Sequence, residues 1–249
     1  MKAKRPKHNP GSEPTTIRSP KFLKPPNKGR RSDEIASQIK NWIISNRIDI
    51  GQKLPAEREL AESLSVSRVV IREALKSLGQ SGFIETRLGA RGGSFVSNKI
   101  YKPFFGIISD LLRDGALSLH HFCEAREAVE KFSMELAMEH IKDEDIDRLR
   151  SINMKLLDDM SNSARFPYSN MEFHVGISEI SRNPLAKLLV TALLQTLIMV
   201  YPSSPQSPKF IEATYERHCK ILEAMGIRDV SLCMACLHED VEVTRNLMV

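Results

Sequence analysis

The sequence predicts a mainly α-helical protein of two domains: a small N-terminal helical domain that carries a β-hairpin, and a C-terminal all-α antiparallel helical bundle. Residues 54–96 read as two short helices, a polar turn between them and a glycine-rich hairpin after them. From Leu117 onward, apolar residues recur at spacings of three and four without strand alternation. A chain of 249 residues is long enough for two such domains.

Charge is distributed unevenly along the chain. Residues 1–31 carry ten basic residues (Lys or Arg) and one acidic residue (Asp or Glu). Residues 32–98 carry nine basic and eight acidic residues, and residues 99–249 carry seventeen basic and twenty-two acidic residues. A basic front and an acidic rear indicate that one end binds a polyanion and that the other has another task. The basic, proline-rich residues 1–31 are predicted to be a disordered arm, either an electrostatic tether to phosphates or an extension without that role.

No segment is a convincing membrane span or export signal. The most apolar run, residues 185–200, contains a lysine and is shorter than a bilayer crossing requires. The N-terminus lacks the apolar core of a secretory signal. We therefore expect a cytoplasmic protein with no membrane partner and with four reduced cysteines. Cys233 and Cys236 form a lone C-x-x-C within a helix, which favours small buried residues over a zinc knuckle.

Three helices are expected in the front domain, residues 32–98. The second is expected to begin at Pro55, because proline is favoured at the first helical position. Ser67 ends the turn that follows and can cap the third helix, residues 67–79, by accepting a backbone N–H. The first helix, residues 32–46, carries an apolar stripe at helical spacing: Ile35, Ile39, Trp42 and Ile43.

The third helix has an apolar side and a basic side. On a helical wheel its apolar residues share one arc, whereas Arg68 and Arg72, four residues apart, project from the other. Such a helix is typical of one that enters a groove of DNA, where arginine can donate two hydrogen bonds to a guanine edge. A solvated arginine face is the alternative when this feature is taken alone.

A basic hairpin follows the third helix. Residues 83–87 and 94–97 read as strands, and the tip between them holds Gly89 with Arg87 and Arg91 beside it. Glycines let the backbone approach phosphate closely. Arg58, on the outer side of the second helix, would lie near the sugar–phosphate backbone. The order of these elements predicts a winged helix-turn-helix that binds double-stranded DNA.

The front domain also matches a known pattern in three places: Leu54-Pro-Ala-Glu-Arg-Glu-Leu-Ala61, Ser67-Arg68 and Ile71-Arg-Glu-Ala-Leu75. With these motifs, residues 33–97 resemble the winged helix of the GntR family of bacterial repressors. Many relatives carry threonine where this chain has Val69, so Val69 either touches a thymine methyl or contributes little, and the operator sequence stays open. The resemblance implies DNA contacts at Arg58, Ser67, Arg68, Arg72 and Gly89.

Residues 99–116 are predicted to form a linker and a short connecting helix, and residues 117–249 a helical effector-binding and dimerisation domain. One of its helices, residues 185–201, is apolar nearly all round, so it is central in the bundle or part of a dimer seam. The other expected helices follow the apolar stripes from Phe122 and from Ile146, and then cover about 168–181, 209–225 and 229–248.

Four residues of the rear domain form a candidate metal site. Asn170 and His174 are four apart and point the same way from one helix. If the last two helices pair antiparallel around Gly226, His218 and Asp240 end up level across the hairpin. Facing helices commonly build metal sites in this way, and imidazole with carboxylate suits zinc, nickel, manganese or iron. Buried histidines are, however, more often satisfied core residues than ligands.

From about Leu119 the rear domain resembles the FCD effector domain of the FadR subfamily, chiefly in Glu124-Ala-Arg126, in Phe173-His174, and in His218 with Ile221-Leu-Glu-Ala224 after it. The resemblance implies a metal site made of one Asp and three His. This sequence matches at His174 and His218, but it has Asn170 in place of the Asp and Asp240 in place of the last His.

Arg126 is a candidate effector-binding residue. It flanks the apolar stripe of its helix, and a guanidinium there can grip an acid ligand with two hydrogen bonds. The alternative is an exposed ion pair with Glu130, four residues on. The family resemblance favours the pocket.

These features predict a ligand-responsive bacterial transcriptional regulator and not an enzyme. We expect a homodimer that presents two recognition helices to an inverted repeat, and a repressor that a small organic acid releases, with a divalent metal (Zn, Ni or Mn) as a candidate cofactor. The alternatives are a metal-sensing regulator and a metalloenzyme fused to a DNA-binding domain, although the sequence offers no nucleophile–base pair.

Overall fold

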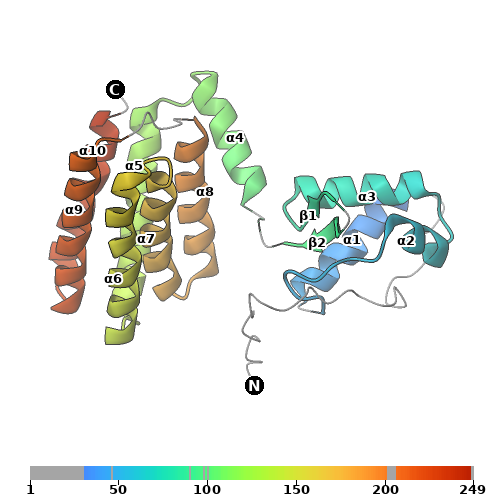
Figure 1. The fold of residues 1–249 in the computed structure, drawn as a ribbon, viewed down its shortest axis with the longest axis horizontal. Helices are drawn as coiled ribbons and strands as arrows, with labels where there is room; N and C mark the ends of the chain where they lie inside the picture. Colours follow the sequence, from blue (N-terminus) through green and yellow to red (C-terminus); the bar gives the residue numbers. More distant parts are fainter. Residues whose placement is uncertain are drawn as a thin grey trace. The chain divides into compact units, whose positions relative to one another are not determined.

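The computed structural model describes residues 31–247 apart from 46, 90, 98, 100 and 201–205. The expected arm at residues 1–31 lies outside the described residues except for Arg31, which begins the first helix. The chain divides into two compact units, residues 1–103 and 104–249 (Figure 1). None of the described helices is long and apolar enough to cross a bilayer.

The front unit is a winged helix-turn-helix. It comprises α1 (Arg31–Ile44), α2 (Glu57–Leu64), α3 (Arg68–Gln80), β1 (Ile84–Arg87) and β2 (Gly93–Val96). The two strands pair antiparallel, with Ile84 opposite Val96 and Arg87 opposite Gly93. The apolar sides of the three helices and one side of the hairpin enclose a single core, which includes Ile35, Ile39, Leu60, Leu64, Ile71, Leu78, Ile84 and Val96.

Local hydrogen bonds set the ends of α2 and α3. The Ser67 hydroxyl accepts the backbone N–H of Val70 at 3.4 Å and so caps α3, as predicted. Ser65 ends α2 in the left-handed region, with φ 54°. The expectation that α2 begins at Pro55 was wrong, because Ala56 is the N-cap and its N–H is taken by the Glu59 side chain at 3.1 Å, so the helix starts at Glu57.

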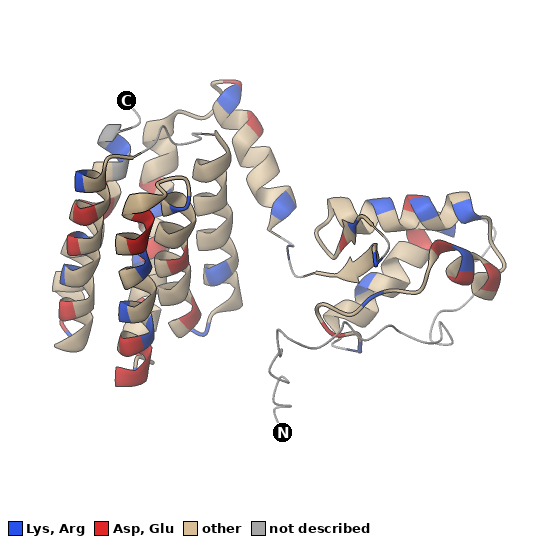
Figure 2. Cartoon of the chain, viewed as in Figure 1, with Lys and Arg blue, Asp and Glu red and all other residues tan. Residues whose placement is uncertain are grey.

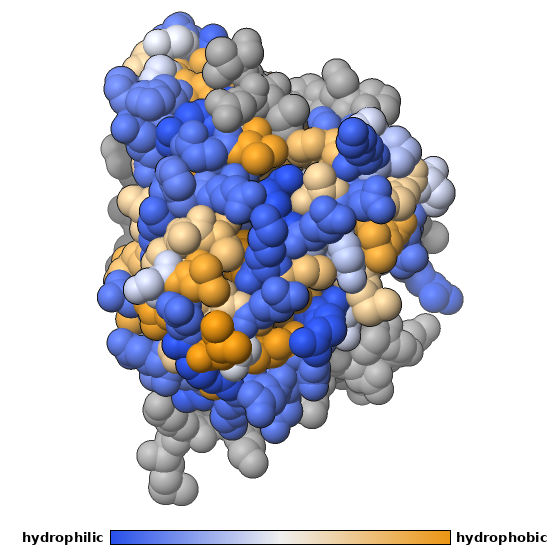
Figure 3. Space-filling view, turned by 90° about the vertical axis from the view of Figure 1, so that its left-hand side faces the viewer, coloured by the Kyte–Doolittle hydropathy of each residue, from blue (hydrophilic) through white to orange (hydrophobic). Residues whose placement is uncertain are grey.

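The rear unit is an all-helical bundle. Its elements are α4 (Lys102–Arg113), α5 (Leu119–Met138), α6 (Asp143–Asp158), the short 3-10 helix η1 (Asp159–Ser161), α7 (Phe166–Ile180), α8 (Pro184–Val200), α9 (Pro208–Gly226) and α10 (Val230–Leu247). Helix α5 packs against α7, α8 and α10, while α9 packs against α6 and α10 (Figure 1). Figure 3 shows one face of the molecule, on which hydrophilic residues are in the majority and hydrophobic ones are scattered.

Helix α8 is apolar nearly all round, as its sequence shows, but it is not the central helix. It buries Val190, Leu193 and Leu197 against its neighbours and leaves Leu185 and Met199 exposed. Helices α5 and α7 each pack against three other helices, whereas α8 packs mainly against those two, so the middle of the bundle belongs to α5 and α7. That position matters because both carry polar residues on their buried sides.

Candidate functional site

The recognition helix α3 exposes a basic patch at its start. The side chains of Arg68 and Arg72 are 62% and 64% exposed, and Val69 is equally open between them. Glu57 of α2 reaches both arginines, at 3.0 Å from Nη2 of Arg72 and 3.9 Å from Nη2 of Arg68. Glu57 therefore restricts where the two guanidinium groups point. Arg58, next to it, is exposed on the outside of α2 beside Glu62.

The wing is basic and needs glycine at its tip. The Arg87 guanidinium lies 4.2 Å from the centre of the Phe95 ring and pairs with Glu85, so it is held against the hairpin. Gly89 is exposed with φ +100°, and Arg91 is exposed near it. A Cβ on Gly92 would lie 2.4 Å from the carbonyl oxygen of Arg87, which no real side chain tolerates. The tip can thus bring backbone close to a phosphate.

A groove of about 580 Å³ separates α3 from the wing. Its cations are Lys53, Arg72 and Lys76, and its acid is Glu57, which is already paired with Arg72. The sequence interpretation missed Lys53 and Lys76. The position of Lys76 four residues after Arg72, on the same side of the helix, was an available signal; Lys53 had none. Figure 2 shows the basic residues along α3.

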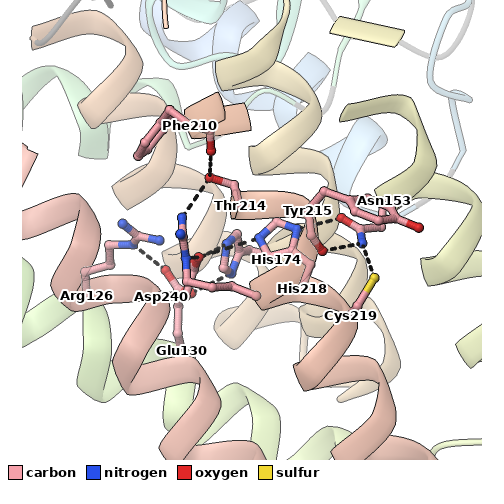
Figure 4. A network of polar contacts seen from close by, with 11 residues as sticks. Arg126, Glu130, Asn153, His174, Phe210, Thr214, Tyr215, His218, Cys219 and Asp240 are labelled. Carbon is pink, nitrogen blue, oxygen red and sulfur yellow. Dashed lines mark hydrogen bonds and ion pairs between the residues drawn. The ribbon is translucent and has the colours of Figure 1, made fainter. Parts of the chain in front are cut away.

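A second group of polar residues lies buried in the rear unit, and its members come from five helices. Figure 4 shows these side chains pointing toward one another. Apart from Arg217, which is 12% exposed, each is less than 5% exposed. The group comprises Arg126 and Glu130 on α5, Asn153 on α6, His174 on α7, Arg217 and His218 on α9, and Asp240 on α10.

His174 lies between two carboxylates. Its Nδ1 is 2.9 Å from Oε2 of Glu130, and its Nε2 is 3.3 Å from Oδ2 of Asp240. His218 Nε2 is 3.9 Å from Oδ1 of Asp240. One ligand atom from each of His174, His218 and Asp240 lies within 4.8 Å of the others, so the fold brings together these three of the four expected metal ligands.

Asn170, the fourth expected ligand, lies one turn before His174 on α7. Its Oδ1 is buried, and within the described part of the chain it has no hydrogen-bond partner. His238, two residues before Asp240 on α10, is exposed and contacts Glu127 at 2.7 Å. Cys233 and Cys236 are free thiols, and Cys233 is fully buried.

The charges of the buried group perturb each other strongly. Burial alone would lower the pKa of His174, but the Glu130 and Asp240 carboxylates outweigh it and raise the pKa to about 9. Burial lowers the pKa of His218 to about 3, so this ring is neutral. Burial would raise the pKa of Glu130, yet Arg126 and His174 bring it down to about 2. The pKa of Asp240 is lowered in the same way, chiefly by His174 and His218.

For Arg126 the sequence left open an effector-binding role and an exposed ion pair with Glu130. The i, i+4 ion pair is present, with Nε 2.5 Å from Oε1, but it is buried and not exposed, because the side of α5 that carries it faces the inside of the bundle. Arg126 is 1% exposed, and its Nη2 is buried without a hydrogen-bond partner among the residues described. That nitrogen is a donor available to a ligand.

The donor set fits a divalent cation. Two imidazoles and a carboxylate are ligands that zinc, nickel and manganese accept. The lone pair of His218 Nε2 is buried without a hydrogen-bond donor in the described structure, which is costly unless something positive approaches it. Arg217 is the competing cation, since its Nε donates to Oδ1 of Asp240 at 3.0 Å.

A winged helix-turn-helix with an exposed basic recognition helix, followed by a helical domain with a buried polar site, defines a DNA-binding transcriptional regulator. Residues 31–96 match the bacterial regulatory proteins of the gntR family, and residues 121–242 match the FCD domain. The chain therefore belongs to the GntR family of transcriptional regulators and carries an FCD effector domain.

Relatives cover nearly all of the chain. It is 31% identical over 222 residues to the HTH-type transcriptional regulator YcbG of Bacillus subtilis, covering 88% of this chain and 91% of YcbG. It is 30% identical over 223 residues to the HTH-type transcriptional repressor NanR of Salmonella newport, covering 87% of this chain and 84% of NanR. These relatives are regulators and not enzymes, and so is this chain.

The fold has a solved counterpart. The Streptococcus agalactiae GntR structure superposes with a TM-score of 0.62 at 23% identity, covering 86% of this chain and 99% of that one. At this identity the likeness concerns the fold alone.

Proposed function

We propose that this regulator is a homodimeric repressor that binds an inverted-repeat operator and leaves it when a small organic acid enters the FCD domain. The observation that carries the effector half of the proposal is the guanidinium of Arg126, which is almost fully buried and has Nη2 unused beside the His174 cluster. A buried cation with a spare donor favours a carboxylate ligand. The repressor NanR, a relative over most of the chain, supports the sign of regulation.

For the operator, Arg68 and Arg72 read base edges while Arg58, Ser67, Arg87, Gly89 and Arg91 contact the sugar–phosphate backbone. Val69, as open as its arginine neighbours, meets a thymine methyl. Lys53 and Lys76 add phosphate contacts in the groove between α3 and the wing.

The candidate cofactor is a divalent cation held by His174, His218 and Asp240, with the Asn170 oxygen as the fourth donor. When bound, such an ion would supply a positive centre for the effector carboxylate. The buried positions of these side chains and the unpaired atoms of His218 and Asn170 support this assignment.

The dimer seam is proposed to include α4. Phe104, Ile107 and Leu111 are spaced by three and four residues, so they share one side of this helix, and each is between 43% and 64% exposed. An apolar stripe of this kind is stabilised when a partner covers it. The exposed residues Leu185 and Met199 of α8 are further apolar surface in the same unit.

DNA binding with and without candidate acids tests the proposal. The full chain should bind a labelled fragment from its own chromosomal neighbourhood at modest ionic strength, and Arg68→Ala should cost about 1–3 kcal/mol and relax base preference. Arg126→Lys keeps the charge but loses the planar fork, so it should bind DNA normally and need at least about ten times more acid for release. Absence of any DNA retention by the wild type would refute the proposal.

The second candidate function is a pure metal sensor, which the His174, His218 and Asp240 cluster favours. In that case the affinity for DNA follows the concentration of Zn²⁺, Ni²⁺ or Mn²⁺ with no organic acid present, and Arg126→Lys has no effect on the response.

A further inference from the structure

Asn153 is an amide in the apolar interior of the rear unit, and its contacts fix which way it faces. It is 1% exposed on the buried side of α6. One end lies 3.1 Å from the carbonyl oxygen of Tyr215, which can only accept, so this end is the NH₂ group (Figure 4). The other end, Oδ1, therefore points to Nδ1 of His218 at 2.9 Å.

This contact determines where the His218 ring carries its proton. An amide oxygen only accepts, so Nδ1 of His218 must donate and must carry the hydrogen. A neutral imidazole has one N–H, which leaves a lone pair on Nε2. The ring of Phe173 stacks on the imidazole, with centroids 3.9 Å apart and planes 8° from parallel, and so fixes the plane in which the imidazole lies.

The lone pair faces an acceptor. Nε2 of His218 lies 3.9 Å from Oδ1 of Asp240, and both atoms can only accept in this tautomer. The other tautomer would place an N–H on Nε2 and direct its hydrogen toward Asp240, so this nitrogen could not bind a cation. The contact with Asn153 disfavours that tautomer, so the site keeps a place for a cation between imidazole and carboxylate.

We propose that Asn153 is the positioning residue of this site: it holds His218 in the tautomer whose Nε2 lone pair faces Asp240, and so sets the affinity for a divalent cation. The inference rests on the cation site proposed above and adds a residue from α6, a helix that holds none of the proposed ligands. Partners that orient a ligating histidine typically change metal affinity by about 10- to 100-fold when removed.

The test uses three variants of the full chain. Asn153→Leu keeps the size and removes the hydrogen bonds. Asn153→Asp keeps an acceptor toward Nδ1, an arrangement common around metal-bound histidines. Thr196→Val is the matched control, because it deletes one buried hydrogen bond, from Thr196 Oγ1 to the carbonyl of Ala192 at 2.8 Å, on a helix that carries none of the network.

Two measurements are made on each variant. Long-range ¹H–¹⁵N spectra of histidine-labelled, metal-free protein report which nitrogen of His218 is protonated, with the signal assigned by its loss in His218→Gln. Competition with a chromophoric chelator gives the dissociation constant for Zn²⁺. We expect an unprotonated Nε2 in the wild type, in Asn153→Asp and in Thr196→Val, protonation at Nε2 in Asn153→Leu, and Zn²⁺ binding weaker by about 10- to 100-fold in Asn153→Leu alone.

Two results overturn the inference: a protonated Nε2 in the wild type, or an Asn153→Leu protein whose spectrum and Zn²⁺ affinity match those of Thr196→Val. A wild type with the expected tautomer that binds neither Zn²⁺, Ni²⁺ nor Mn²⁺ overturns the proposed cation site instead, and the spectra alone then decide whether Asn153 sets the tautomer.

Discussion

Replacing Arg126 by methionine tests whether the buried polar group is held by its charges. The substitution keeps an unbranched chain of similar length but removes the guanidinium that lies 2.5 Å from Glu130. Glu130 is only 4% exposed, so its carboxylate is left in the interior with His174 as its remaining charged neighbour within 3 Å among the described side chains. Removing one partner of such a pair costs about 3–5 kcal/mol.

That loss is large against the ~5–15 kcal/mol by which a domain is stable, and it should be confined to the rear unit. Urea unfolding monitored by far-ultraviolet circular dichroism follows the helices, most of which belong to that unit. The single tryptophan of the chain, Trp42, packs against the core of the front unit, so its fluorescence serves as the internal control. In Arg126→Met we expect the urea concentration at the midpoint of the dichroism transition to be lower than in the wild type. The midpoint of the fluorescence transition should be unchanged.

A double-mutant cycle with Glu130→Gln separates the pair from its surroundings. Each single substitution leaves a buried group without its partner, whereas the double variant removes both charges. The double variant should therefore lose less stability than the sum of the two single variants, by up to about 3 kcal/mol. A loss below about 1 kcal/mol for Arg126→Met, or strictly additive losses, would show that the charges are solvated or relaxed and would refute the reasoning.

Three further predictions concern the DNA surface and the dimer. Lys76→Ala should weaken binding to all sequences alike and reduce the slope of log affinity against log salt by about 1, while Lys155→Ala, an exposed lysine of the rear unit, changes neither. Gly92→Ala should lower DNA affinity without shifting the unfolding of the rear unit, because its Cβ would force the wing tip to rearrange. Ile107→Glu should convert a dimer into a monomer in light scattering, and a persistent dimer would remove α4 from the seam.

The front unit could be predicted almost completely from sequence because its signals are local. Ser67 caps α3 by accepting the backbone N–H of Val70, three residues further on, and the apolar stripe around Ile71 fixes which side of the helix is buried. The error at Pro55 was local too: Glu59 satisfies the Ala56 N–H and makes Ala56 the cap, so proline falls one position outside the helix. Lys53 was missed because only the folded hairpin brings it beside α3.

The rear site depended on tertiary packing, and the sequence predicted it in part. The four-residue spacing of Arg126 and Glu130 predicts the ion pair, but no local pattern in the sequence indicates that both side chains face the interior. Asn153 lies between Ile152 and Leu156 in a buried stripe, and an amide there is a signal that was available. Arg217, the residue before His218, reaches Asp240 across the hairpin, and no local pattern in the sequence indicates this contact.

The charge balance of the buried group explains why a carboxylate can stand where the family resemblance implies a histidine. Arg126 and Arg217 offset Glu130 and Asp240, so these four side chains sum to zero. Any further positive charge, whether a proton on His174 or a divalent cation beside it, leaves the site net positive in a place from which water is largely excluded. Uncompensated buried charge is costly, and a carboxylate ligand offsets it. The carboxylate at position 240 is thus balanced by Arg217, and the acid ligand proposed above would offset any further positive charge that enters the site.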